Sequence, residues 1–395
     1  MERFFCPKSV YKSLTGTSYY YMGTEGGSTV DTFTTLEQRL AGCLLGGAVG
    51  DALGLPYEGI SRSRLSKMYP HLLQYHFLFG HGMVSDDTEH AIMTAQALLV
   101  SGGEVTLFQR RLARSLRFWL LGIPAGIGFA TLRSILRLWV GISPTKSGVF
   151  SAGNGPAMRS AILGVCFGEN PDKLRELVRA STQITHTDPK AEQGAFAIAL
   201  TTHFLCKSEN LSLAHFYEFQ SEYLGSDATE FLSLLEQVVQ SVETGESTAG
   251  FAKKMGLEEG VSGYILHTVP VAIHAALSHP QDLEHALGAV LECGGDTDTV
   301  AAITGGVVGA CIGAQKIPER LKNGFWEPVY SPQWMAQLAT SLTDTVQKGT
   351  KQRPKPTLWI LLPFRNALFL LIVLLHGFRR LLPPYGTKQA KSSKG

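Results

Sequence analysis

The chain has no pair of cysteines in a C-x-x-C arrangement. Its six cysteines are scattered: Cys6, Cys43, Cys166, Cys206, Cys293 and Cys311. This spacing suggests neither a disulfide framework nor a zinc site, and it favours a reducing, cytoplasmic setting. The N-terminus lacks the apolar core of a secretory signal, because residues 1–32 are a mixture rich in Ser, Thr, Gly and Tyr. We expect these residues to form a flexible arm.

Charge is also scarce. Only 17% of the 395 residues are charged, 44% are hydrophobic, and the formal net charge is +2. This composition predicts a globular protein with a large core. It argues against a general polyanion binder, so no specific nucleic-acid partner is predicted.

In the C-terminal tail, the uninterrupted apolar run is too short to cross a bilayer, which takes about 20 residues. The segment from Ala367 to Leu375 is fully apolar, but Pro363 and Arg365 interrupt the longer stretch. We expect a packed or membrane-surface helical hairpin here. Because Lys and Arg flank it, peripheral membrane contact, and with it a membrane-associated location, stays an open alternative.

Strand-like alternation is almost absent, and apolar residues recur at helical spacing along most of the chain. The sequence therefore predicts an all-α fold with a single globular multi-helix domain over residues 33–347. Residues 348–395 are expected to be a basic linker and a hydrophobic tail. The domain begins at Thr34, whose spacing to Glu37 matches a capping box, and a glycine-rich helix follows.

Two acidic stretches stand at predicted helix starts. One is Gly294-Gly295-Asp296-Thr297-Asp298-Thr299, and the other is Ser85-Asp86-Asp87-Thr88. Each could simply cap its helix, since Asp, Ser and Thr are ordinary N-cap residues. Four aspartates in two such clusters nevertheless carry a charge of −4, which two divalent cations would neutralise. Hard oxygen ligands suit Mg²⁺, Mn²⁺ or Ca²⁺.

Three loops carry further candidates. Pro56 and Gly59 bound a loop that presents Glu58, either as an acid near the clusters or as a structural or gating residue. A glycine-rich loop from Ser151 to Arg159 could offer backbone N–H groups to a phosphate, or could be a plain turn. His186 lies in a third loop and is either structural or functional.

Together these residues resemble the ADP-ribosylglycohydrolase family over roughly Glu37 to Ile317. The resemblance rests on G-x-x-x-G-D-A-x-G-x-P-x-E (Gly46 to Glu58), S-D-D-T (Ser85 to Thr88), G-N-G-x-x-M-R (Gly153 to Arg159) and G-G-D-T-D-T (Gly294 to Thr299). It implies an all-α domain with a cleft that holds two metal ions, Mg²⁺ or Mn²⁺.

The resemblance also implies roles for particular residues. Glu58 and Asp87 are the expected catalytic residues. The expected metal ligands are Ser85, Asp86, Asp87, Asp296, Asp298 and Thr299, with Asp298 shared between the ions. The expected contacts to ADP-ribose are Ser151, Gly153, Asn154, Gly155, Met158 and His186.

The implied function is hydrolysis of the glycosidic bond between ADP-ribose and an acceptor, so the expected partner is an ADP-ribosylated substrate. Two alternatives stay open: a non-catalytic ADP-ribose-binding relative, and a Mg²⁺-dependent, all-α prenyl-diphosphate enzyme. The second is disfavoured because His90 stands where a D-D-x-x-D motif that starts at Asp86 would have its third aspartate.

Overall fold

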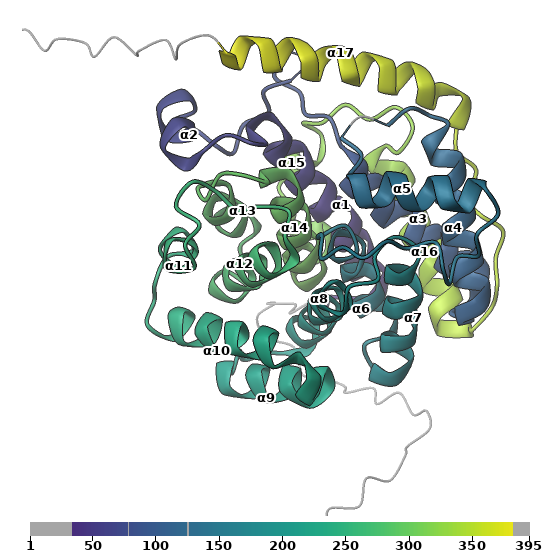
Figure 1. Cartoon of the computed structure of the whole chain (residues 1–395), viewed down its shortest axis with the longest axis horizontal. Coiled ribbons are helices and arrows are strands. Elements are labelled where there is room, and N and C mark those ends of the chain that lie inside the picture. Colours follow the sequence, from purple (N-terminus) through teal and green to yellow (C-terminus); the bar gives the residue numbers. More distant parts are fainter. Residues whose placement is uncertain (1–33, 78, 125, 382–395) are drawn as a thin grey trace, which may run out of the picture. The chain divides into compact units, whose positions relative to one another are not determined.

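The computed structural model describes residues 34–77, 79–124 and 126–381. These residues form helices and no strand, apart from isolated bridges, which confirms the all-α prediction (Figure 1). The predicted N-terminal arm, residues 1–32, lies outside the described residues. The first helices are α1 (Leu36–Gly54), α2 (Arg62–Met68), α3 (Asp86–Ser101), α4 (Val105–Leu120), α5 (Phe129–Trp139), α6 (Ala161–Phe167), α7 (Pro171–Gln183) and α8 (Pro189–Lys207).

The second half of the chain is built in the same way. Its helices are α9 (Leu213–Leu224), α10 (Thr229–Glu243), α11 (Thr248–Lys254), α12 (Ile265–Ser278), α13 (Leu283–Leu291), α14 (Thr297–Ile312), α15 (Glu319–Lys322), α16 (Pro332–Lys348) and α17 (Leu362–Leu381). Short 3₁₀ turns are η1 (Leu55–Tyr57), η2 (Ala157–Arg159), η3 (Ser226–Ala228), η4 (Ala314–Lys316) and η5 (Trp359–Leu361).

Several helices begin where local chemistry favours a start. Asn170, Asp188 and Ser331 cap α7, α8 and α16 with their side chains, and a proline follows each cap. Proline suits the first helical position because the N–H that it lacks has no intrahelical partner there. For α1 the prediction was wrong by one residue. The N-cap is Thr35, whose hydroxyl accepts from the backbone N–H of Gln38 at 3.2 Å.

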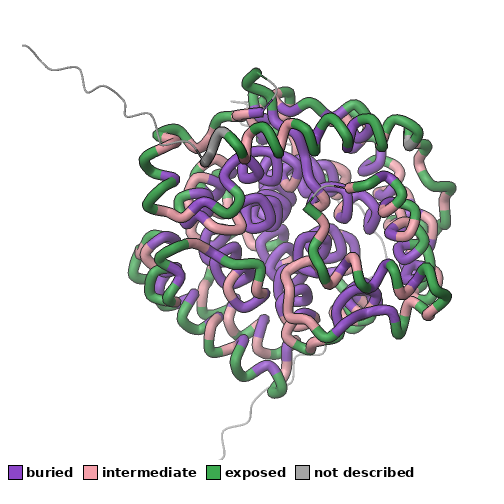
Figure 2. The backbone as a smooth tube through the Cα atoms, turned by 45° about the horizontal axis from the view of Figure 1, so that its top comes forward, coloured by how far each residue is buried: buried purple, intermediate pink, exposed green. Residues whose placement is uncertain are grey.

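Buried residues gather in the middle of the molecule (Figure 2). Most residues of α1 and all residues of α14 are buried. Glycines recur at every fourth residue of α1, so they share one face of the helix. A Cβ placed on Gly42, Gly46, Gly50 or Gly54 would lie 2.0–2.3 Å from a backbone oxygen of Gly309, Gly305, Ala301 or Thr297, respectively. The order of these pairs shows that the helices run antiparallel. The C-terminal end of α1 therefore lies beside the N-terminus of α14.

Among the described residues, one segment is long and apolar enough to cross a membrane. It is Leu36–Tyr57, which comprises α1 and η1. Of its most apolar 18-residue stretch, 94% is buried inside the protein. Its apolar character is therefore accounted for by packing in the core.

In the described part of the C-terminal tail, up to residue 381, one long helix stands in place of the predicted hairpin. After η5, α17 runs from Leu362 through Pro363 and Arg365 without a break. Pro363 is tolerated because it lies in the first turn, where its missing N–H costs no hydrogen bond. Arg365 is tolerated because it is buried against acidic partners of the domain. The domain boundary at residues 347 and 348 stays a prediction.

The close packing of α1 on α14 leads to a prediction about two neighbouring glycines. Gly46→Ala should destabilise the fold, because the new Cβ would meet the carbonyl of Gly305 and force the helices apart. Gly47→Ala is the matched control, since its Cβ would make an ordinary contact at 3.5 Å and would gain about 1 kcal/mol of helix propensity. Urea unfolding measures both. Equal stability of the two variants would contradict the account.

Candidate active site

Ser85 begins the first acidic turn. It is the N-cap of α3, and its Oγ accepts from the backbone N–H of Asp87 at 3.2 Å. The same hydroxyl donates to Asp87 Oδ2 at 3.2 Å. Asp86 and Asp87 follow in the first turn, where unpaired N–H groups and the helix dipole favour negative charge. Ser85 thus caps the helix and at the same time orients a carboxylate.

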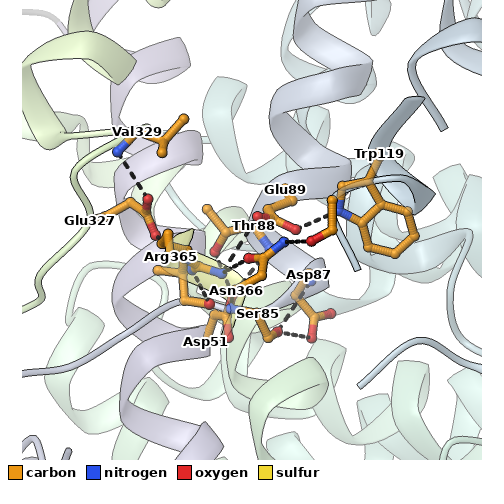
Figure 3. A network of polar contacts seen from close by, with 12 residues as sticks. Asp51, Ser85, Asp87, Thr88, Glu89, Trp119, Glu327, Val329, Arg365 and Asn366 are labelled. Atoms are coloured by element: carbon orange, nitrogen blue, oxygen red, sulfur yellow. Dashed lines mark hydrogen bonds and ion pairs between the residues drawn. The ribbon is translucent and has the colours of Figure 1, made fainter. Parts of the chain in front are cut away.

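Asp51 of α1 binds this turn from within the protein (Figure 3). Its Oδ2 accepts from the backbone N–H of Ser85 at 2.9 Å and of Thr88 at 3.1 Å, and also from the Thr88 hydroxyl. The motif from Gly46 to Glu58 contains Asp51, but its spacing alone assigns no role to this residue. In the structure Asp51 joins the end of α1 to the start of α3.

The second acidic turn depends on two glycines with left-handed backbone, Gly294 at φ 70° and Gly295 at φ 84°. A Cβ on Gly295 would lie 2.1 Å from the carbonyl oxygen of Val261, so only glycine fits. Asp296 is the N-cap of α14, yet its side chain makes no capping hydrogen bond. Instead its Oδ2 accepts from Asn154 Nδ2 at 2.6 Å. Simple capping therefore does not account for the Asp296 carboxylate.

The two acidic turns meet in space. Thr299 Oγ1 of α14 donates to Asp87 Oδ2 of α3 at 3.1 Å. Burial raises the pKa of Asp87 well above its usual range, and the charges of Asp51, Asp86 and Asp296 raise it further. For Asp298, burial and then the charges of Glu58 and Asp296 raise the pKa. The carboxylates therefore repel one another when ionised, as expected of a centre built to receive positive charge.

The residues present fit divalent cations. Oδ1 of Asp51, of Asp87 and of Asp298 is buried without a hydrogen-bond partner in the described part of the chain. Buried carboxylate oxygens normally have a donor, so these three are open to a cation. Within residues 34–381 as described, no three Asp, Glu, His or Cys side chains already have the arrangement of a formed metal site. The suitability of this centre for divalent cations thus rests on the unpaired carboxylate oxygens and on the repulsion between the carboxylates.

The glycine-rich loop lies against His186. A Cβ on Gly153 would lie 3.0 Å from His186 Nε2, and one on Gly155 would lie 3.2 Å from its Cε1. Ser151 Oγ accepts from the N–H of Gly153 at 3.3 Å. Asn154, through its bond to Asp296, connects this loop to the acidic centre.

Met158 lies behind the acidic centre. It is buried, and it lines a small internal cavity together with Asp87 and Gly306. The structure thus brings Met158 close to Asp87 from the core side of the turn.

Arg159 was given no role from the sequence, although the loop motif ends on it. It is fully buried and donates to Ser181 and to Thr185 Oγ1, and its Nη1 lies 3.2 Å from His90 Nδ1. Thr185 Oγ1 in turn lies 2.9 Å from His186 Nδ1. Burial, with the charge of Arg159 as a second cause, lowers the pKa of His186 to about 3. His186 is therefore a neutral imidazole near pH 7.

Glu58 is exposed, as the loop prediction required, and it follows η1. The next residue, Gly59, donates its N–H to the carbonyl of Gly295 at 2.7 Å. The charge of Glu58 is among the causes that raise the pKa of Asp298 and of Asp86. The loop therefore holds Glu58 within electrostatic range of both acidic turns.

A buried ion pair lies behind the first turn, and sequence spacing gave no sign of it (Figure 3). Arg365 of α17 donates to Glu327 Oε2 from Nε at 3.0 Å and from Nη2 at 2.6 Å, and also to the carbonyl of Val84. Its Nη1 lies 3.6 Å from Glu89 Oε1. Burial raises the pKa of Glu89 to about 7, although Arg365 and the indole N–H of Trp119 lower it. The tail thus supplies a cation beside the acidic centre.

These features define a class: an all-α protein whose acidic centre is assembled from the N-termini of two helices and lies beside a glycine-rich loop. A family model described as ADP-ribosylglycohydrolase matches residues 32–352. The chain belongs to the ADP-ribosylglycohydrolase family, which confirms the resemblance and indicates a glycohydrolase that acts on ADP-ribosylated substrates.

Individual relatives agree with this assignment. An uncharacterised protein of Archaeoglobus fulgidus is 30% identical over 78% of this chain and 97% of its own length. The ADP-ribosyl-dinitrogen reductase glycohydrolase of Rhodospirillum rubrum is 25% identical over 73% of this chain and 90% of its own length. The bovine ADP-ribosylhydrolase ARH3 is 26% identical over 71% of this chain and 87% of its own length. A solved structure named ADP-ribosylglycohydrolase-related protein complex has a TM-score of 0.54 at 26% identity, covering 79% of this chain and 99% of that one.

The repulsion in the acidic centre predicts the behaviour of Asp298→Asn. Without metal this variant should unfold at a higher temperature than the unaltered protein, because one of several repelling charges is gone. Each unit by which that repulsion raises a carboxyl pKa corresponds to about 1.4 kcal/mol. Added Mg²⁺ or Mn²⁺ should stabilise the unaltered protein and have much less effect on the variant. Thermal unfolding with and without metal tests this, with the exposed Asp172→Asn as control. An undiminished metal effect in Asp298→Asn would refute the assignment.

The buried ion pair predicts that Arg365→Met destabilises the domain. Methionine fills much of the space but leaves Glu89 and Glu327 buried without their cation, which typically costs about 3–5 kcal/mol. The exposed Arg353→Met on the linker should change stability little. Adding Glu327→Gln to Arg365→Met should recover part of the lost stability, measured by urea unfolding. If the stability changes of the two single variants simply add in the double variant, the two side chains do not interact directly.

Proposed function

We propose that this protein hydrolyses the glycosidic bond between C1 of the distal ribose of ADP-ribose and an acceptor, with the help of two divalent cations. The observation that carries the proposal is the meeting of two acidic turns, each of which has a buried carboxylate oxygen, Oδ1 of Asp87 or of Asp298, without a donor among the described residues. Membership of a glycohydrolase family supports the reaction class.

The cations would be Mg²⁺ or Mn²⁺, and the residues that would hold them are Ser85, Asp86, Asp87, Asp296, Asp298 and Thr299. When bound, they would neutralise the carboxylates and attract oxygen atoms of the ribose as Lewis acids. Asp298 is the proposed shared ligand, because its pKa responds to Glu58 and to carboxylates of both turns. Asp87 is held by the hydroxyls of Ser85 and Thr299, which keep its carboxylate oriented towards the centre.

The rest of ADP-ribose would lie along the glycine-rich loop. A Cβ on Gly153 or Gly155 would be crowded against His186, which favours glycine at both positions. Because these residues have no side chain, a phosphate could approach the backbone of the loop closely. The proposed contacts are Ser151, Gly153, Asn154, Gly155, Met158 and His186. His186 is neutral and so adds no positive charge to the phosphate site; its ring can offer a hydrogen bond or a packing surface.

Glu58 is the proposed group that moves a proton. In the reaction a water oxygen forms a bond to C1 while the bond from C1 to the acceptor breaks. One proton of the water passes to the acceptor, and a carboxyl group near C1 can carry it. Glu58 suits this role because its loop is hydrogen-bonded to Gly295 and because Glu58 is exposed to solvent.

Glu58→Gln tests this proposal. The amide keeps the size of the side chain but cannot exchange a proton, so single-turnover hydrolysis of an ADP-ribosylated peptide should fall by about 10²–10⁴-fold. ADP-ribose affinity, measured by calorimetry at saturating Mg²⁺ or Mn²⁺, should change by less than about tenfold, because Glu58 acts in the transition state.

Glu259→Gln is the control, since Glu259 is also an exposed loop carboxylate. Near-normal hydrolysis by Glu58→Gln would remove Glu58 from the mechanism. Loss of ADP-ribose binding together with turnover would make Glu58 a gate or a structural support. ADP-ribose binding by the unaltered protein, without turnover of any ADP-ribosyl linkage, would favour the non-catalytic relative.

A further inference from the structure

The outer face of α17 is apolar and uncovered. Its inner face buries Arg365, Asn366 and Phe369 against the domain. The opposite face carries large apolar side chains that are 37–74% exposed and recur at three- and four-residue spacing: Phe364, Leu368, Leu371, Leu375 and Phe378. A surface helix of a globular protein normally places polar residues on this face. The helix therefore packs one face on the domain and exposes an apolar face on the opposite side.

Two further exposed apolar residues flank α17. Phe79 is fully exposed and lies two residues from Phe77, whose ring packs against His376 of α17 at 4.9 Å. Ile123 is 71% exposed and follows Gly122, whose carbonyl accepts from Asn366 Nδ2 at 2.8 Å.

Phe79 and Ile123 are also the two non-glycine residues with positive φ among those described, at 60° and 53°. This backbone is unfavourable for bulky and especially for β-branched side chains. An unfavourable conformation that presents an apolar side chain to water suggests that the side chain has a partner.

The segment of the chain that contains α17 is also strongly basic, whereas the rest of the chain is acidic. Residues 345–395 contain ten Lys and Arg and no Asp or Glu. All 33 acidic residues and the other 25 basic ones lie in residues 1–344, which therefore carry a formal charge of −8. One of the ten cations, Arg365, is buried and paired. In the sequence, four of the remaining nine precede Phe364 and five follow Phe378. Of the first four, Lys348 pairs with Asp344 and Lys351 with Glu104, both at the surface.

From these observations we propose that α17 docks on the surface of an anionic bilayer, lying parallel to it. The apolar face would enter the boundary between headgroups and acyl chains, and the cations on either side would contact anionic headgroups. A second copy of the chain is a poorer occupant, because a symmetric pairing would bring two strongly basic segments together. Spanning is also disfavoured, since the inner face is joined to the domain through Arg365.

This surface adjoins the acidic centre. Gly122, which follows α4 and contacts α17 through Asn366, is four residues before Gly126, where a Cβ would lie 3.6 Å from Asp86 Oδ1. Docking would thus hold the proposed active site close to the bilayer. The membrane proposal does not depend on the proposed hydrolysis, and its test requires no turnover.

The experiment is flotation of the full chain with vesicles. Vesicles of phosphatidylcholine that contain phosphatidylserine should bind the protein, pure phosphatidylcholine vesicles should bind it at least about tenfold more weakly, and raised salt should weaken binding. Leu371→Asp combined with Leu375→Asp should reduce binding by at least about tenfold, since both side chains lie on the outer face. Val140→Asp, an exposed apolar residue at the end of α5, is the matched control.

Unchanged thermal unfolding of the double variant would show that the fold is intact. If it does not fold, Leu371→Asp alone and the lipid and salt dependence of the unaltered chain decide the question. Failure of the unaltered chain to bind anionic vesicles would overturn the proposal, and so would equal binding by the outer-face variants. A dimer in vesicle-free solution that Leu371→Asp converts to a monomer would assign the face to a second copy instead.

Discussion

The close antiparallel packing of α1 on α14 is the constraint on which the rest of the structure depends. Glycines spaced by four residues allow the backbones to touch, and the contact runs from Gly42 beside Gly309 to Gly54 beside Thr297. Asp51, near one end of the contact, accepts hydrogen bonds from the first turn of α3. The N-termini of α3 and α14 are thereby brought to one place, and Thr299 bonds to Asp87. Core packing and the acidic centre are thus one arrangement.

The acidic centre concentrates negative charge, and the fold offsets that charge in two visible ways. Helix N-termini provide unpaired N–H groups and favourable dipoles to the aspartates. Behind the first turn, Arg365 contacts Val84, Glu89 and Glu327. The unpaired oxygens of Asp51, Asp87 and Asp298 show that this compensation is incomplete in the described residues, which fits the reception of cations. Substrate phosphates would bind beside the aspartates, so added positive charge would serve both binding and stability.

The starts of the two helices that carry the acidic turns could be predicted because short motifs mark them. The serine before Asp86 and the glycines before Asp296 show from sequence where helices begin, and the structure begins α3 and α14 at these places. Pairing of the glycine-rich loop with His186 could not be read from spacing, since 27 or more residues separate His186 from that loop and only tertiary packing joins them. The tail was misjudged for a related reason: Arg365 looked like an interruption because its partners, Glu89 and Glu327, are distant in sequence.

The sequence by itself determined the all-α class, the family and the local form of each acidic turn, because helix periodicity, capping and glycine turns are short-range effects. It also placed Glu58 in an exposed loop. Only the tertiary structure decided that Asp51 binds the first turn, that Arg159 joins His90 to the loop of His186, and that α17 is one helix with a buried arginine. Each of these depends on buried polar groups finding partners far along the chain, and such partners are selected by packing rather than by sequence spacing.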